Sequence, residues 1–145
     1  MFPQVALELK ILEEVPPLVT KVAALARGDD DVVGVALFGS FVKRGCSAIS
    51  DIDICLFLRP RNYAGEELNR KRLRYVDAAA NDRADVQLFQ QLPLHVRSMV
   101  LKEANWVLVK DEPALYELAM QTIRNFEDFR KHYDEYLAGV ADAKP

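Results

Sequence analysis

Asp51 and Asp53 are the first residues whose type and spacing suggest chemistry, because they open an apolar run that ends at Leu58. Two residues that are two apart on a strand point to the same face, so both carboxylates are expected together at the start of this strand. Like charges at a partly buried site are costly unless a cation compensates them. Carboxylate oxygens suit magnesium, which takes phosphate oxygens as further ligands. The pair therefore predicts a magnesium site that faces a phosphate.

The rest of this run predicts a strand with two different faces. One face consists of alternating aliphatic side chains, namely Ile52, Ile54, Leu56 and Leu58. The other face carries the acids and continues with Cys55 and Phe57. The acids are thus attached to a strand that otherwise belongs to the core, and Cys55 is expected to be a small buried residue.

Asp85 is the third candidate acid, because it heads a second apolar run that ends at Phe89. If that strand pairs beside residues 52–58, the Asp85 carboxylate can reach the same metal centre. Three acids on two neighbouring strands are typical of a two-metal site for phosphoryl transfer. One ion would hold a triphosphate and the other would activate an attacking hydroxyl, with Asp85 as a metal ligand and possible general base.

The loop before the acids contains Gly39 and Ser40 directly after a buried apolar strand. A glycine there lets the backbone approach a phosphate, and free N–H groups at a helix start would point at the anion. Ser40 adds a hydroxyl donor, while Lys43 and Arg44 can offset phosphate charge. Taken alone, a Gly-Ser pair is usually a turn, an Asp-x-Asp is usually surface, and Lys43 and Arg44 can equally belong to a solvated loop. The joint order of these features favours a nucleotide-phosphate site.

Helices and strands are expected to alternate around one sheet that positions these residues. A helix is expected over residues 4–27 with a break at Pro16-Pro17, a second over 64–80, a short third from Pro93 to about Ala104, and a long last helix. Strands are expected at Val32–Phe38, Ile52–Leu58, Ala84–Phe89 and Trp106–Val109. The fold class is therefore α/β with a mixed sheet. We expect one domain over 1–145, with its core at about 18–110.

The composition excludes several classes of protein. A chain of 145 residues fits one core, and a formal net charge of −3 lacks the broad basic footprint of most nucleic-acid-binding proteins. The two cysteines and two histidines have neither zinc-site nor disulfide spacing. The longest strongly apolar stretch, Val32 to Val42, is too short to cross a bilayer, and no signal peptide is evident at the start. We therefore expect a cytoplasmic protein with no membrane partner.

The last helix, at about 112–137, is predicted to start at an Asp111 cap and to carry a heptad-like seam. The seam comprises Leu115, Ala119, Thr122, Phe126, Phe129, Tyr133 and Tyr136. Its first half is expected to pack on the sheet of the chain itself. Its aromatic end is expected to meet a partner, and a homo-oligomer through this helix stays open.

Two other sets of polar residues receive simpler interpretations. The basic cluster of Arg70, Lys71, Arg72 and Arg74 is expected to form a solvated helix face, with contact to an acidic partner or to the triphosphate as the alternative. His95 and His132 lack metal-ligand spacing and are interpreted as structural or surface residues.

The segment 39–53 resembles the minimal nucleotidyltransferase family, the small branch of the DNA polymerase β-like superfamily. The family motif is Gly-Ser, ten residues and Asp-x-Asp, and residues 39–53 match it in identity and spacing. The likeness continues to Asp85-Val86 and to the helix-strand ending at residues 92–111. Family members commonly have Gly-Ser-x-Ala-Arg-Gly, whereas Gly45 lies one residue later here. This departure weakens the inference for Arg44 but not for the acids.

The resemblance implies a fold, a site and an activity. It implies Asp51, Asp53 and Asp85 as catalytic metal ligands, and Gly39 and Ser40 as the loop that binds the nucleotide phosphates. Many family members are antitoxins that transfer AMP from ATP to a tyrosine of a HEPN ribonuclease toxin, with Mg²⁺. Two alternatives remain, namely an antitoxin that neutralises its partner by binding alone and an enzyme that modifies a small molecule such as an antibiotic. The nucleotide base and the acceptor are not fixed by the sequence.

Overall fold

A four-stranded sheet forms the centre of the computed structural model, which describes residues 11–12, 15–39, 52–79 and 84–142. The strands are β1 (Val32–Phe38), β2 (Ile52–Leu58), β3 (Ala84–Leu88) and β4 (Asn105–Val109), in the order β3-β2-β1-β4. β1 is antiparallel to β2 and to β4, while β2 and β3 run parallel. The mixed sheet and the placing of the third strand beside the second confirm the prediction.

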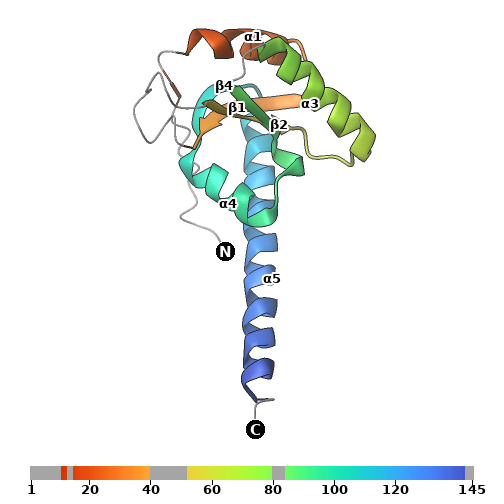
Figure 1. Cartoon of the computed structure of the whole chain (residues 1–145), viewed down its shortest axis with the longest axis vertical. Helices are drawn as coiled ribbons and strands as arrows, with labels where there is room; N and C mark the ends of the chain where they lie inside the picture. The colour runs from red at the N-terminus through yellow and green to blue at the C-terminus, as the bar shows by residue number, and fades with distance from the viewer. Residues whose placement is uncertain (1–10, 13–14, 40–51, 80–83, 143–145) are drawn as a thin grey trace.

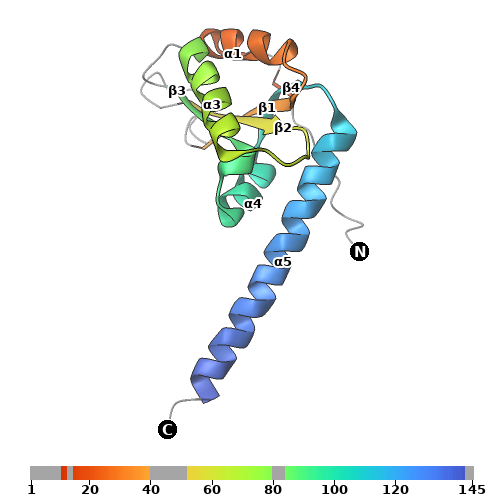
Figure 2. The same cartoon turned by 90° about the vertical axis from the view of Figure 1, so that its right-hand side faces the viewer.

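Helices cover both faces of this sheet. α1 (Pro17–Arg27) and α3 (Gly65–Ala79) lie on one face. The other face carries the 3₁₀ turn η1 (Phe89–Gln91), α4 (Leu94–Glu103) and the first half of α5 (Glu112–Asp142). Figures 1 and 2 show the resulting three layers, with the second half of α5 extending away from them.

The alternation along β2 divides the buried side chains into two clusters, one on each face. Ile52, Ile54, Leu56 and Leu58 pack with α1 and α3, as their period of two predicts. Cys55 and Phe57 face α4 and α5 together with Trp106 of β4. The Phe57 ring stacks near Phe89 with centroids 4.6 Å apart and lies 4.7 Å from Trp106. Burial of such rings supplies much of the stability of this layer.

Gly34 allows α5 to approach the sheet closely. A Cβ atom at this position would lie 2.8 Å from Cζ3 of Trp106 and 3.1 Å from Cδ1 of Leu115. The register of β1 shifts between Val32 and Gly34, so the strand contains an irregularity at this point. The bare backbone therefore makes room for the first turn of α5.

The prediction of a helix over 4–27 is wrong at residues 11–12. Ile11 forms a parallel bridge with Trp106, and the Leu12 N–H donates to the Trp106 carbonyl at 2.8 Å. This segment therefore covers the outer edge of β4, whose backbone groups need partners. α1 begins only at Pro17, where proline suits the first helical turn. Residues 1–10 and 13–14 lie outside the described residues.

The start of α5 agrees with its prediction, and its end lies further on. Asp111 caps the helix, because its Oδ1 accepts a hydrogen bond from the Ala114 N–H at 3.1 Å. The helix continues to Asp142, beyond the predicted end at about Leu137. Leu115, Ala119 and Thr122 are buried, so the first half of the seam packs on its own domain.

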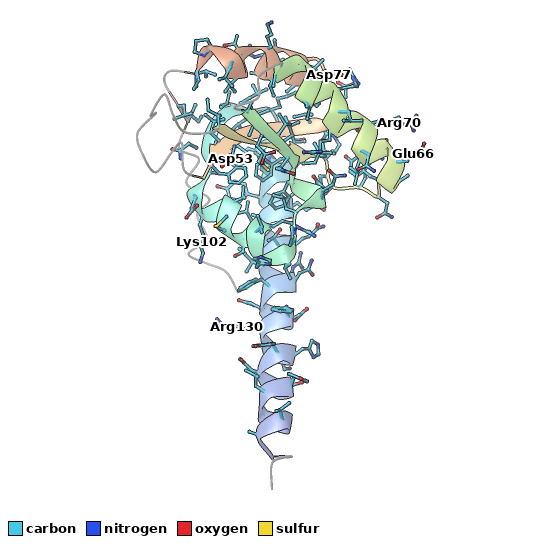
Figure 3. The ribbon with its side chains drawn as sticks, viewed as in Figure 1. Asp53, Glu66, Arg70, Asp77, Lys102 and Arg130 are labelled. Atoms are coloured by element: carbon cyan, nitrogen blue, oxygen red, sulfur yellow. The ribbon has the colours of Figure 1, made fainter. Side chains whose placement is uncertain are left out.

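The basic cluster of α3 is only partly a solvated face, and this prediction is wrong for two of its four residues. Lys71 is buried, and its Nζ binds the Asp29 carboxylate at 2.8 Å. The Arg72 Nε donates to the Val86 carbonyl at 2.9 Å, on the exposed edge of β3. Arg70 stays exposed on the outer side of α3 (Figure 3), as does Arg74.

Asp29 is the centre of a polar network at the end of the sheet where β1 begins. Besides Lys71, its carboxylate accepts hydrogen bonds from the Tyr75 hydroxyl at 2.8 Å and from the Asp31 N–H at 3.1 Å. Burial alone would raise the pKa of Asp29, but these donors outweigh it and hold that pKa below its ordinary value. The network ties the turn after α1 to α3.

No helix in the described part of the chain has the length and apolarity that a membrane span requires.

Candidate active site

The two described acids of the predicted site lie side by side on neighbouring strands. Asp53 of β2 and Asp85 of β3 are register partners in the parallel pair, so their side chains leave the same face of the sheet. Asp53 is half-buried and Asp85 is exposed. Figure 3 shows Asp53 at the sheet, between the helical layers. The strand that carries Asp85 therefore pairs beside residues 52–58, as the prediction for Asp85 required.

Gly39 follows β1 and presents bare backbone to the Asp53 carboxylate. Phe38, the last residue of β1, is the antiparallel partner of Asp53, which brings the next residue beside the acid. Gly39 has φ +80°, a conformation that side chains with a Cβ rarely adopt. A Cβ added to Gly39 would collide with Oδ2 and Cγ of Asp53. The glycine thus leaves space at the carboxylate that any other residue would fill.

Gln87 is a residue of this site that the sequence analysis missed. It lies two residues after Asp85 on β3 and therefore shares its face. Its Nε2 donates a hydrogen bond to Oδ1 of Asp85 at 3.0 Å. The signal in the sequence was this spacing of two along a predicted strand. The contact holds one oxygen of the Asp85 carboxylate in place.

The layer behind Asp53 is buried and apolar. Cys55, two residues after Asp53 on the same face, is fully buried, and this burial raises the pKa of its thiol well above the ordinary value. Phe57 continues the face into the aromatic cluster with Phe89 and Trp106. The Cys55 thiol is therefore an inert part of the core, as its apolar surroundings predicted, and the acids lie at the rim of this layer.

The remaining predicted site residues are Asp51, Ser40, Lys43 and Arg44, and all four lie outside the described residues. The helix start considered for the phosphate loop lies there too. Within the ranges that the structure describes, no group of three or more acidic, histidine or cysteine side chains gathers as metal ligands do. The two described acids nevertheless fit a divalent cation, because they are like-charged neighbours beside bare backbone.

His95 and His132 lie far from these acids in the chain and on its surface. Both side chains are exposed, as interpreted from the sequence. The Nδ1 atom of His132 lies 3.7 Å from the carboxylate of Glu135, one turn further along α5. Neither histidine contributes to the candidate site.

Residues 20–113 match the family described as polymerase beta, nucleotidyltransferase. This match includes β1 to β4 and all the candidate site residues. The chain belongs to the polymerase beta nucleotidyltransferase family. A Methanocaldococcus jannaschii protein that carries the provisional name protein adenylyltransferase is 31% identical over 104 residues, which is 72% of this chain and 77% of the relative.

Solved structures agree with the fold of this nucleotidyltransferase. One is a chain of a toxin-antitoxin crystal structure with AMP-PNP, with TM-score 0.61, 16% identity, and coverage of 84% of this chain and 97% of the other. A second comes from the MntA-HepT toxin-antitoxin complex, with TM-score 0.58, 15% identity, and coverage of 86% and 97%. A third comes from a tri-AMPylated Shewanella oneidensis HEPN toxin in complex with an MNT antitoxin, with TM-score 0.55, 12% identity, and coverage of 86% and 98%.

Proposed function

We propose that this nucleotidyltransferase transfers AMP from ATP to a hydroxyl group of a partner protein, a HEPN-type toxin, and thereby acts as its antitoxin. The observation that carries the proposal is the pairing of Asp53 with Asp85 on adjacent strands, beside the bare backbone of Gly39. Family membership supplies the reaction class. The names of the curated relative and of the structural neighbours support protein adenylylation and a toxin partner.

Asp51, Asp53 and Asp85 are proposed to hold two magnesium ions. When bound, these ions supply charge neutralisation for the triphosphate and lower the pKa of the attacking hydroxyl. Gln87 orients Asp85 through the 3.0 Å hydrogen bond to its Oδ1. In the proposed reaction the acceptor hydroxyl attacks the α-phosphate in line, Asp85 takes its proton, and pyrophosphate leaves.

The loop that begins at Gly39 is proposed to bind the triphosphate. Gly39 itself has φ +80° beside Asp53. We propose that backbone N–H groups of the residues after it face the phosphates. Ser40 would add a hydroxyl donor, and Lys43 and Arg44 would offset phosphate charge. AMP-PNP in one structural neighbour supports ATP as the nucleotide.

The test measures transfer of label from ATP labelled at the α-phosphate. The purified protein is incubated with magnesium and with a HEPN toxin that it binds. We expect label on the toxin band, and we expect the Asp53→Asn, Asp85→Asn double variant to lose it. Asp77→Asn, the same chemical change on the outer side of α3 (Figure 3), should label the toxin as well as the unchanged protein does.

Two results would contradict the proposal. Equal labelling by the double variant would show that the acids are not the site. Absence of label with a toxin that the protein demonstrably binds would remove the transferase activity toward that acceptor. Omission of magnesium should abolish labelling, and replacement of ATP with the other nucleoside triphosphates tests the base.

The second candidate function is neutralisation of the partner by binding alone. The observation that favours it is the exposed aromatic half of α5, which includes Phe129, Tyr133 and Tyr136. Growth of cells that express the toxin separates the two candidates. Rescue by the Asp53→Asn, Asp85→Asn variant would favour binding, whereas failure to rescue, with complex formation retained, would favour catalysis.

A further inference from the structure

The second half of α5 is a long helix with one apolar side and no contact to the rest of the described chain. Residues 127–141 are exposed throughout, and the helix ends at Asp142. Its large apolar residues include Phe129 at 55% exposure, Tyr133 at 51%, Tyr136 at 65% and Val140 at 41%. Both views of the fold show this half projecting from the domain (Figures 1 and 2). Contiguous exposed apolar surface of this kind marks an interaction site.

These side chains form one stripe. Phe126, Phe129, Tyr133, Tyr136 and Val140 are spaced by three and four residues, which is the spacing of a coiled-coil seam. The rings of Phe129 and Tyr133 lie nearly parallel, with centroids 6.1 Å apart. Toward the domain the same stripe passes Thr122, which is buried against the core. A second helix laid along the stripe must therefore stop where it meets the domain.

A polar hollow of about 230 Å³ lies at that stopping point. α5 contributes Leu118, Gln121, Thr122 and Asn125 to its wall, and the other described lining residues include Arg97 of α4 and Arg61. None of these described lining residues is acidic. Arg61 is paired with Asp31 and Glu67, whereas in the described part of the chain Arg97 donates only its Nε, to the Leu92 carbonyl. The hollow therefore suits a group with negative charge.

We propose that α5 pairs antiparallel with α5 of a second copy of this chain, with Phe129 of each copy against Tyr133 of the other. This inference does not depend on the proposed function. In this register Phe126 of one copy meets Tyr136 of the other, so the four central layers are aromatic on both sides. An a position of one helix then faces a d position of the other in every layer, as in antiparallel coiled coils.

The same register places the end of each helix at the hollow of the other copy. Val140 of one copy falls opposite Thr122 of the other, and the last turn, which ends at Asp142, reaches the level of Gln121. The final carbonyl groups of a helix carry a partial negative charge that nearby cations stabilise. Arg97 supplies this cation. A parallel pairing would bring the two domains together at one end and would leave both hollows without a helix end.

The first experiment measures the mass of the full chain by sedimentation equilibrium over a range of concentrations. We expect twice the chain mass of 16.4 kDa. The Phe129→Ala, Tyr133→Ala variant should raise the dimer dissociation constant by about 100-fold or more, because buried aromatic residues dominate such interfaces. Lys131→Ala, Asp134→Ala changes two exposed residues off the stripe and should leave the mass unchanged. Circular dichroism checks that each variant keeps its helix content.

The second experiment tests orientation with spin labels at Arg124→Cys, Lys131→Cys or Ala138→Cys, in a Cys46→Ser background. These three positions lie on the side of the helix opposite the seam. In the antiparallel dimer the label at 131 should give the shortest distance. The two labels at position 124 should lie about 21 Å further apart along the helix axis than the two labels at position 131, because 14 residues rise roughly 1.5 Å each. The same holds for the two labels at position 138. A parallel dimer would give three equal distances.

The third experiment tests the hollow. Arg97→Ala should weaken the dimer by about fivefold, and Arg97→Lys should restore most of the affinity because it keeps the cation. Arg70→Ala, on α3, is the control (Figure 3). A monomer at all concentrations, equal label distances, or a monomer that buries Phe129 and Tyr133 only against the toxin would each overturn the proposal.

Discussion

The two ends of the sheet each hold an acidic cluster, and the two clusters are built in opposite ways. Where β1 begins, Asp29 is nearly buried, and it is satisfied by the Lys71 ammonium and the Tyr75 hydroxyl. At the other end, Asp53 has another acid, Asp85, as its register partner, and the donor on Asp85 is a neutral amide. One carboxylate is thus held by a lysine, whereas the other end of the sheet places two carboxylates beside each other.

The contrast separates stability from activity. Removal of the lysine from a buried carboxylate–lysine pair destabilises the fold, because it leaves an uncompensated charge. Two neighbouring acids at a partly exposed rim oppose folding slightly and attract a cation. Substitutions at the Asp29 end should therefore lower stability, whereas substitutions at the Asp53 end should lower activity. Measuring the melting temperature and the rate of AMP transfer for each variant tests this expectation.

The largest effect on activity is expected for Asp53→Asn. Loss of this proposed magnesium ligand should remove several kcal/mol of transition-state stabilisation, so transfer of AMP should fall by about 10²–10³-fold or more. The melting temperature without magnesium should stay the same or rise, because one of two like charges is gone. Calorimetry beside the transfer assay checks both. A clear fall in melting temperature would place Asp53 with Asp29 among the structural acids.

Gly39→Ala should come next in its effect on activity. The new Cβ would collide with the Asp53 carboxylate, and φ +80° disfavours alanine by about 1–2 kcal/mol. A displaced catalytic group can cost about 100-fold in rate. Gly65→Ala is the control, because a Cβ at Gly65 would meet nothing within 4 Å. Full activity of Gly39→Ala would show that the close approach to Asp53 is dispensable.

Lys71→Met should give the largest loss of stability with little loss of activity. Both side chains of the pair are almost buried, at 10% and 9% exposure, and removal of the lysine leaves Asp29 without its cation. The expected cost is about 3–5 kcal/mol, or a fall in melting temperature of roughly 10 °C. The folded enzyme should keep its rate. Lys102→Met, on the exposed side of α4 (Figure 3), should change neither quantity.

The pH dependence of the melting temperature should show whether Lys71 acts on Asp29 through its charge. The pKa of Asp29 is lowered in the folded protein, so its contribution is present above the unfolded pKa of about 3.9 and is lost as pH falls through the folded pKa. In Lys71→Met, the pKa of Asp29 should be higher than in the unchanged protein, because burial is then opposed by fewer donors. The gap in melting temperature between the two proteins should therefore narrow from pH 6 to pH 3. A constant gap would mean that Lys71 acts through packing alone.

The sheet was predictable because its strands are short and apolar. Val32–Phe38 and Ile52–Leu58 were predicted with the bounds that the structure has, since each is a β-rich run ended by polar residues or glycine. The strand at Ala84 was predicted one residue too long, because Phe89 is apolar but starts a 3₁₀ turn. Local pattern therefore located the strand that carries Asp53 and the one that carries Asp85.

The wrong predictions for Lys71 and Ile11 concern contacts between distant parts of the chain. Lys71 looks like one member of a basic run, and its burial depends on Asp29, which lies 42 residues away. Ile11 lies in a segment of helical composition, yet it forms a parallel bridge with Trp106 at the edge of β4. Period and propensity carry no information on such partners. Gln87 was missed for a different reason, because an amide two residues after an acid does not by itself indicate a hydrogen bond between them.

Gln87→Leu should give the smallest effect, a fall in transfer rate of about two- to tenfold at limiting magnesium. The lost hydrogen bond to Asp85 is exposed, and such a bond contributes about 0.5–1.5 kcal/mol. Because Gln87 positions the acid, higher magnesium should recover most of the rate. Gln91→Leu removes a matched bond, from the Gln91 Nε2 to Asn69 Oδ1 at 2.9 Å, away from the acids. An equal fall in both variants would show a general effect of the substitution, whereas a shift of the magnesium requirement in Gln87→Leu alone would place Gln87 in the site.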